Sequence, residues 1–437
     1  MDANLRRVSV PVLTFPASRS GALARWEAFQ PLVPAYGAKR NLVAPGHPHV
    51  SRLSPAIRSR LVTEDEITAG LLAKHPSSVA QKFLQEIFWR RYWKGWLETR
   101  PAVWRDYADR LEALKGTLHE VVRQRADEVM AGRSGVAIMD RFARELVETG
   151  YLHNHARMWW ASFWIHVERL PWEVGADFFL RHLLDADAAS NTLNWRWVAG
   201  LQTKDKPYLV TRANLEQCCA PELLVDTTGL ERLDEKKVRA TVFDVVGPDA
   251  PTPTPEASRF ATYPTKPAQL AERSGLWIHE EDLTPEIGEL HEAAFVAAAA
   301  FTSAAEDGTA SLGAPRRRHR DASFADAVER AGEHFGCTAE MLPSTTLAEG
   351  LAAWAVKERL GAVVAYAPAV GPLNDRLEAV RAALTTAGVE LVLCRRPTDF
   401  QLWPYARGGY FGFMGQAEKW LKAQTKAQAK ARIATAG

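Results

Sequence analysis

The stretch "LLDADAASNTLNWRWVAG", residues 183–200, decides how the first half of the chain is interpreted. It contains two acids, an amide and two tryptophans: Asp185, Asp187, Asn191, Trp195 and Trp197. It lacks the alternation of a β-strand and lies in a region whose pattern is helical. Acids, an amide and paired indoles so close together indicate chemistry as well as packing, and the flanking sequence shows which kind.

The chain from Pro55 to about residue 240 has helical periodicity throughout. Thr63 and Glu66 form a predicted capping box ahead of an apolar run. A long helical pattern covers residues 78–100, two helices are predicted on either side of Gly150, and Pro171 starts another. We therefore predict an all-helical domain over residues 1–240.

The character of the sequence changes near residue 247. Residues 241–272 are predicted to be a Pro/Thr-rich linker and residues 273–437 a small α/β domain with a basic tail. The predicted elements are a strand in 275–283, a helix capped by Thr284, a loop at 308–323, a helix at 344–361, a strand at 362–368, a helix at 373–388, a strand at 389–395 and a basic helix from 419.

Composition limits the function classes. The chain has 437 residues, 47% hydrophobic residues and a net charge of +2, so any nucleic-acid contact must come from a local patch. The four cysteines include no C-x-x-C pair, which favours reduced thiols over a zinc or iron–sulfur site. No leader-like or membrane-spanning apolar run is present, so the expectation is a soluble, cytoplasmic protein without a membrane or a metal. Fifteen tryptophans fit either a helical core or a surface for stacking flat ligands.

Three further motifs combine residue types suited to ligands. Ser51, Arg52 and Ser54 precede a helical segment and suit a phosphate, although such a pattern taken alone is more often a plain helix cap. The set Glu86, Trp89, Arg90 and Trp93 is spaced by three or four residues and shares one helix face, which could hold a flipped base or merely pack. The stretch "YLHNHARM" places Asn154, His155, Arg157 and Met158 together, and His153 and His155 are two apart, a spacing that disfavours a metal site.

The four motifs, in this order, resemble the FAD-binding domain of the photolyase/cryptochrome family, over about residues 36–208. The chain is particularly similar to bacterial short photolyase-like proteins that lack the N-terminal antenna domain. The resemblance implies a mainly α fold: an all-helical photolyase-type FAD-binding domain followed by a smaller, Rossmann-like α/β domain.

The resemblance also implies roles for individual residues. FAD would contact Tyr36, Ser51, Arg52, Leu53, Ser54, Phe83, Arg157, Asp185, Asp187 and Asn191. Arg157 would pair with Asp185 beneath the flavin, and Asn191 would face its N5 atom. Catalytic roles would fall to Glu86, Asn191, Trp195 and Trp172, with the two tryptophans forming the start of an electron relay. A flipped pyrimidine dimer would contact Glu86, Trp89, Arg90, Asn154, His155, Met158 and Trp197.

The implied activity is light-driven repair of cyclobutane pyrimidine dimers by a monomer. The DNA would be single- or double-stranded, and a preference for single strands is one form of this expectation. A cryptochrome-like blue-light photoreceptor is the alternative. The family's phosphate motif usually begins with Thr where this chain has Val50, and Arg is usual where it has His155. In the C-terminal half, "AYAPAVGPLNDRL" and "FQLWPYARGGYFGF" look like fragments of the family's α/β antenna domain, although an unrelated accessory module fits as well, and no second cofactor is assigned.

Overall fold

The computed structural model describes residues 14–202, 206–239, 254–255, 263–303 and 312–436. Helices make up the chain as far as Arg239, and a five-stranded sheet begins at Ser274. The predicted Pro/Thr-rich linker and the first residues of the predicted loop at 308–323 lie mostly outside the described residues. The predicted domain limits therefore remain predictions.

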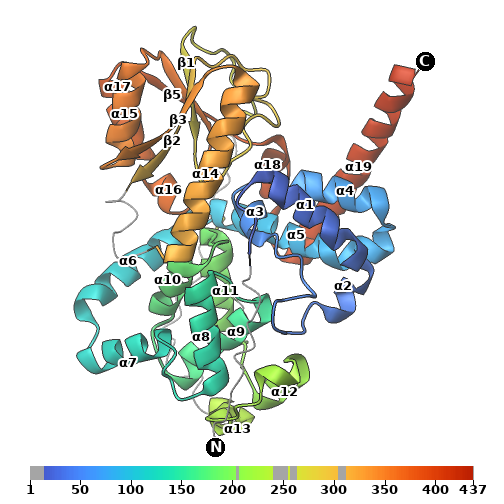
Figure 1. The fold of residues 1–437 in the computed structure, drawn as a ribbon, viewed down its shortest axis with the longest axis vertical. Coiled ribbons are helices and arrows are strands. Elements are labelled where there is room, and N and C mark those ends of the chain that lie inside the picture. Colours follow the sequence, from blue (N-terminus) through green and yellow to red (C-terminus); the bar gives the residue numbers. More distant parts are fainter. Residues whose placement is uncertain (1–13, 203–205, 240–253, 256–262, 304–311, 437) are drawn as a thin grey trace, which may run out of the picture.

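The helical half is a group of packed helices (Figure 1), and their buried faces form a core rich in aromatic side chains. Its elements are α1 (Arg19–Phe29), η1 (Gln30–Leu32), α2 (Val33–Lys39), α3 (Ser54–Arg58), α4 (Glu64–Lys74), α5 (Ser77–Glu98), α6 (Pro101–Thr117), α7 (Glu120–Met130), α8 (Ala137–Thr149), α9 (Asn154–Ser162), η2 (Phe163–Val167), α10 (Trp172–His182), α11 (Ala188–Val198), α12 (Arg212–Cys218), η3 (Pro221–Leu223), η4 (Leu230–Leu233) and α13 (Glu235–Arg239).

The local signals for helix ends act as predicted. Thr63 accepts a hydrogen bond from the backbone N–H of Glu66, and the Glu66 carboxylate accepts one from the backbone N–H of Thr63, which completes the capping box of α4. Gly150 ends α8 at a φ of 73°, in the left-handed region that favours glycine. The first half is helical, as predicted.

The C-terminal half holds a parallel sheet in the order β3-β2-β1-β4-β5. Its elements are β1 (Ser274–Ile278), β2 (Ala297–Ser303), α14 (Ala314–Phe335), β3 (Thr338–Ser344), α15 (Leu347–Lys357), β4 (Ala362–Tyr366), α16 (Pro372–Asp375), α17 (Leu377–Thr386), β5 (Glu390–Cys394), α18 (Pro397–Leu402), η6 (Trp403–Tyr405) and α19 (Tyr410–Ala436). Alternate residues of β1 pack on opposite faces: Trp277 joins the core under α15 and α17, and Leu276 joins the core shared with α14. The sheet is thus doubly wound, as the Rossmann-like prediction requires.

Buried ion pairs join the sheet to the helical half. Asp282, just after β1, pairs with Arg396 at 2.6 Å and with Arg60, which lies just beyond α3, at 3.2 Å. Arg58 donates to the carbonyl of Ala186 at 2.8 Å and to that of Glu280 at 2.6 Å. These contacts fix the carboxyl end of β1 against the segment that leads into α11.

The last helices leave the sheet and pack on α5 (Figure 1). Gly95 of α5 lies so close to this segment that a Cβ atom there would stand 3.0 Å from the Cα of Trp403 and 3.0 Å from the Cβ of Ala406. Phe413 of α19 packs against Phe88 with ring centroids 6.5 Å apart. The segment "FQLWPYARGGYFGF" therefore belongs beside the helical half, and not in an antenna-like α/β layer.

Several expected elements of the second half were wrong or missed. Residues 314–323 begin the long helix α14 instead of forming a loop, and His319 bonds the carbonyl of Pro16 there. Thr284 caps no helix, because its hydroxyl is buried and donates to the carbonyl of Arg60 at 2.9 Å. The strands β2 and β3 were not predicted.

Candidate functional site

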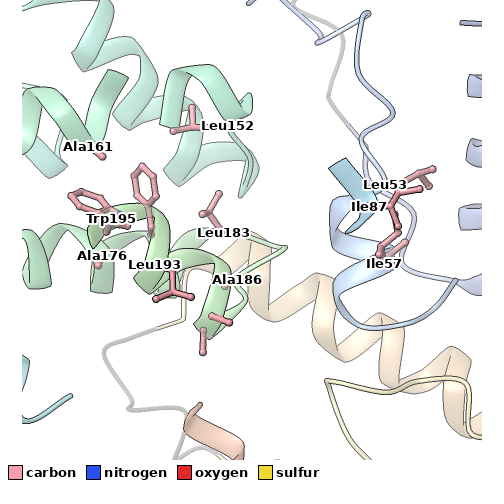
Figure 2. Packing of buried hydrophobic residues seen from close by; sticks show 14 of the residues in the cluster. Leu53, Ile57, Ile87, Leu152, Ala161, Ala176, Leu183, Ala186, Leu193 and Trp195 are labelled. Carbon is pink, nitrogen blue, oxygen red and sulfur yellow. The ribbon is translucent and has the colours of Figure 1, made fainter. Parts of the chain in front are cut away.

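The helical half encloses a large cavity of about 980 Å³, called here the central cavity. One wall carries Ile57 and Ile87, and the other carries Ala161, Leu183 and Trp195, which lie on opposite sides in Figure 2. Its volume lies at the upper end of the range for small-molecule sites.

The central cavity collects nearly all residues that the four motifs single out. Its lining includes Tyr36, Ser51, Arg52, Ser54, Phe83, Glu86, Trp89, Arg90, Asn154, His155, Arg157, Met158, Asp185, Asp187, Asn191, Trp195 and Trp197. Two predicted site residues do not line it: Leu53 is fully buried in the core, and Trp172 packs against Tyr107.

The predicted pair of Arg157 and Asp185 is present. The Arg157 guanidinium, held by the carbonyl of Leu152, donates to the Asp185 carboxylate at 2.9 Å. Burial alone would raise the pKa of Asp185, but the charge and hydrogen bond of Arg157 hold this pKa below its usual value. Asp185 is therefore a buried group in the cavity lining that favours its ionised form.

Asp187 has a structural role in addition to its place in the cavity. It is the N-cap of α11, where its carboxylate accepts from the backbone N–H of Ser190 at 2.9 Å. Arg90 and Lys94 of α5 lie 3.2 and 3.6 Å from it, and they lower its pKa against the opposing effect of burial. The acid thus locks α11 to α5 across the cavity.

The loop before α3 has an unusual backbone. Arg52 has a φ of 57°, a left-handed conformation that non-glycine residues rarely adopt. Arg25 holds the loop by donating to the carbonyl of Ser51 at 2.7 Å. Within the described part of the chain, the buried Nε of Arg52 has no hydrogen-bond partner. Such strain and an unpartnered donor at a cavity wall fit a ligand-binding loop.

Asn191 and Trp195 lie one helical turn apart on α11. The Asn191 amide donates to the carbonyl of Ala176 at 2.8 Å, which fixes its orientation. Trp195 is 2% exposed and contacts Phe179 and Trp160 edge to face, at 5.2 and 6.3 Å between ring centroids. Its indole N–H has no partner among the described residues.

Trp160 is an aromatic neighbour of Trp195, and the sequence motifs did not show its place in an electron relay. Trp160 in turn stacks on Trp164 at 5.2 Å. Trp172, the predicted second relay member, contacts Tyr107 at 5.4 Å, and Tyr107 contacts Trp104 at 5.3 Å. The relay beyond Trp195 therefore stays a prediction.

Glu86 lies at the predicted lesion wall and has a partner that the sequence did not indicate. Arg40 donates to its carboxylate at 2.5 Å. Burial raises the pKa of Glu86, and Arg40 opposes that shift only in part. The carboxyl group is therefore easier to protonate than an ordinary glutamate.

The aromatic residues at the predicted lesion wall are already stacked. The ring of Trp89 lies 3.6 Å from that of Tyr410 at an interplanar angle of 6°, and Trp197 stacks on Tyr208 at 5.3 Å. His155 stacks on Trp159 at 4.2 Å. These contacts hold the indoles in fixed orientations at the cavity.

Sequence reasoning missed the residues that complete the cavity from distant segments. Arg40 and Tyr151 come from the helical half, and the segment Arg407–Phe411 comes from the C-terminal half. The doubled glycine before Tyr410 gave no signal of this approach, because an added Cβ atom at Gly408 or Gly409 would have nothing within 4 Å.

Comparison with known proteins agrees with this geometry. Residues 83–222 match the family described as the FAD binding domain of DNA photolyase. The deoxyribodipyrimidine photo-lyase of Streptomyces griseus is 36% identical over 161 residues, which cover 36% of this chain and 33% of the relative. That of Escherichia coli K12 is 27% identical over 215 residues, 47% of this chain and 44% of the relative. The chain thus spans between a third and under half of these two curated relatives.

Solved structures give weaker likenesses. A bacterial class III photolyase from Agrobacterium tumefaciens has a TM-score of 0.41 and 24% identity, covering 51% of this chain and 54% of that one. A cryptochrome from Synechocystis also has a TM-score of 0.41, with 23% identity over 47% of this chain and 44% of that one.

Residues 83–222 are therefore similar to the FAD-binding domain of photolyases, and FAD is the cofactor that this similarity indicates. The family model and these two relatives each cover less than half of the chain, so the likeness is one of this domain.

The residues present fit FAD. The cavity is large enough, and its wall offers the unpartnered Nε of Arg52 and the unpartnered N–H of Trp195 as donors among the described residues. The lining carries six arginines and three carboxylates, a balance that suits a pyrophosphate.

Among the described helices, none combines the length and the apolar character that crossing a bilayer would require.

Proposed function

We propose that this protein is a DNA photolyase that splits cyclobutane pyrimidine dimers under blue light. The observation that carries the proposal is that two residue sets, one predicted to hold FAD and one predicted to hold a lesion, line one continuous cavity. The curated relatives named above bear the name deoxyribodipyrimidine photo-lyase, which supports this choice of substrate.

FAD, when bound, supplies the light-driven electron transfer, and the chain supplies binding and electrostatics. The loop Ser51–Ser54 would hold the pyrophosphate, with the Arg52 guanidinium as a fork-shaped donor. Arg157 keeps Asp185 ionised and oriented in the cavity lining. Asn191, fixed by the carbonyl of Ala176, would present its amide oxygen to the cofactor.

Glu86 would act on the lesion. Its raised pKa increases the protonated fraction, and a protonated carboxyl group can donate a hydrogen bond to a base carbonyl. Such a donor stabilises the negative charge that an added electron places on the dimer. Arg40, at 2.5 Å, would keep the carboxyl group in place when it is ionised.

Trp197 would stack on the flipped base together with Trp89, while Asn154, His155, Arg90 and Met158 shape the pocket. Stacking contributes about 1–3 kcal/mol per base, so Trp197→Ala should weaken lesion binding about 5- to 150-fold. Trp420→Ala is the matched control, because Trp420 is a partly buried indole on α19 that does not line the cavity.

The test is light-dependent loss of dimers from irradiated oligothymidylate, with purified, FAD-loaded protein and a reductant. We expect loss of dimers in blue light and none in the dark, with the same assay on single strands and duplexes giving the strand preference. Glu86→Ala should lower the repair yield more than the binding affinity. A protein that cannot be loaded with FAD, or repair that is unchanged in both Glu86→Ala and Trp197→Ala, would contradict the site assignment.

Trp195 would deliver the electron that reduces the flavin, with Trp172 as the predicted next donor and Trp160 as a second neighbour. Trp195→Phe should slow photoreduction strongly and leave FAD content and repair by chemically reduced protein intact. Unchanged photoreduction kinetics would assign the first donor to another residue.

A blue-light photoreceptor is the second candidate, and one observation favours it. Tyr410 covers one face of Trp89, so the protein's own C-terminal segment occupies part of the predicted lesion wall. Wild-type protein that binds FAD and is photoreduced, but never removes dimers, would favour this function.

A further inference from the structure

The segment Arg407–Phe411 forms part of the rim of the central cavity although it follows the α/β layer in sequence. Tyr410 is buried, whereas Arg407, Gly408 and Gly409 are exposed. Phe411 is 83% exposed, as much as any large hydrophobic side chain in the described part of the protein. An apolar ring in water at the mouth of a large cavity is a candidate contact for a ligand that enters there.

This rim segment is firmly anchored to α5 and to the residue that precedes α6. Arg100 donates to the carbonyl of Arg407 at 2.6 Å, and Tyr92 donates to that of Gly408 at 2.8 Å. Tyr410 donates to the carbonyl of Gln85 at 2.7 Å, and its ring stacks on Trp89. Phe411 is thus attached to a fixed neighbour, with the two rings 5.7 Å apart and inclined at 68°. The exposed ring is presented by a rigid support.

The charge at the cavity favours a nucleic acid as the occupant. The three carboxylates of the lining each pair with an arginine of the same lining: Glu86 with Arg40, Asp185 with Arg157 and Asp187 with Arg90. Arg407, four residues before Phe411, adds an exposed arginine to the same lining. An exposed aromatic ring with a neighbouring cation is the combination that contacts a base and a phosphate together.

We propose that Phe411 is a wedge that enters the DNA stack where the damaged nucleotides have left it. Moving a base into a pocket leaves a gap in a duplex, and apolar side chains can fill such a gap by stacking on the flanking bases. Tyr410 positions the wedge by holding the segment on Trp89. This inference rests on the proposed function, because it requires that the lesion enters the central cavity.

The wedge predicts a difference between two forms of the substrate. Phe411→Ala should weaken binding to dimer-containing duplex about 5- to 150-fold, the loss expected for one stacking contact of about 1–3 kcal/mol. Binding to a single-stranded oligothymidylate dimer should change much less, because a flexible strand leaves no fixed gap to fill. FAD content should stay the same, since Phe411 is exposed at the rim.

The experiment measures affinity for both DNA forms by fluorescence anisotropy with the full-length, FAD-loaded protein. Phe400→Ala on α18 is the matched control, because this phenylalanine is 39% exposed and does not line the cavity. Phe411→Leu should retain part of the duplex affinity, since it keeps an apolar side chain. Preserved flavin absorption shows that each variant is folded.

Three results would overturn the inference, and they are distinguishable. Equal duplex affinities of Phe411→Ala and Phe400→Ala, with wild-type binding intact, would reject the wedge and leave the proposed function standing. Tighter binding by Phe411→Ala would identify the segment as a cover over the cavity. A wild-type protein that binds FAD but neither form of damaged DNA would reject the wedge together with the proposed function.

Discussion

Replacing Gly175 with alanine tests how closely α10 approaches the buried indoles. A Cβ atom at residue 175 would lie 2.8 Å from Cζ3 of Trp195, closer still to its Cη2, and 2.9 Å from Nε1 of Trp164. Ordinary contacts of this kind are 3.4–4 Å. Trp195 is 2% exposed and Trp164 is fully buried, so neither ring has room to withdraw.

The expected cost follows from two opposing effects. Overpacking a core costs about 1–3 kcal/mol, and a clash with two buried indoles should cost about 3 kcal/mol, the upper end of this range. Alanine stabilises a helix by about 0.5–1 kcal/mol relative to glycine. Gly175→Ala should therefore lower the free energy of unfolding by about 2 kcal/mol.

Gly116→Ala is the matched control, because Gly116 lies in helix α6 with nothing within 4 Å of the added atom. That variant should be about 0.5–1 kcal/mol more stable than wild type. Urea unfolding followed by circular dichroism measures both, and flavin photoreduction reports any displacement of Trp195. Equal stability of the two variants would show that the packing around Trp195 is not as described.

Three further predictions test buried groups. Arg157→Met leaves Asp185 buried without its charge partner, so we expect a loss of about 3–5 kcal/mol in unfolding free energy and of FAD affinity, and Asp185→Asn in the same chain should restore part of the stability. Burial lowers the pKa of His153 from 6.5 to about 3, so the unfolded chain takes up a proton at this residue between those values. His153 thus contributes stability that is present above pH 6.5 and is lost as the pH falls. The free energy of unfolding of His153→Gln should therefore change less with pH than that of wild type, by up to about 1.4 kcal/mol per pH unit, which urea midpoints at pH 5 and 7 measure. Asp282→Ala removes the carboxylate that joins Arg396 to the helical half and should cost about 3–5 kcal/mol in the same unfolding assay, whereas an unchanged midpoint would show that the contact contributes little.

The helical half was predictable because its signals are local. Capping at Thr63, the glycine end of α8 and the i, i+3 and i, i+4 spacing on α5 depend on neighbours within a few residues. The pair of Arg157 and Asp185 joins separate motifs, and it followed from the family resemblance rather than from spacing.

The second half was harder because its local signals conflict with its structure. The strand β2 begins "AAAA", a composition that favours helices, and it is held by parallel partners on both sides. The start of α14 is rich in arginine and has no apolar stripe, and contacts from distant segments hold it. Tertiary context decided both elements.

The cavity rim shows the same limit. The stack of Trp89 on Tyr410 joins residues that are far apart in the sequence, and no local pattern predicts such a pair. Leu53 differs from its neighbours in the motif, because its side chain is buried in the core, and its contact with FAD stays a prediction.

The packing of the C-terminal helix on α5 also affects how the chain can fold during its synthesis. Tyr92 and Gly408 are 316 positions apart, so at about 5–20 residues per second a ribosome needs roughly 15–60 s to deliver the partner after α5 emerges. During that interval Phe88, Tyr92 and Trp89 lack the cover that Tyr410 and Phe413 provide. A nascent chain therefore exposes an aromatic surface that is prone to aggregation and that chaperones would shield. A fragment that stops at residue 240 should be insoluble when it is expressed without residues 397–436.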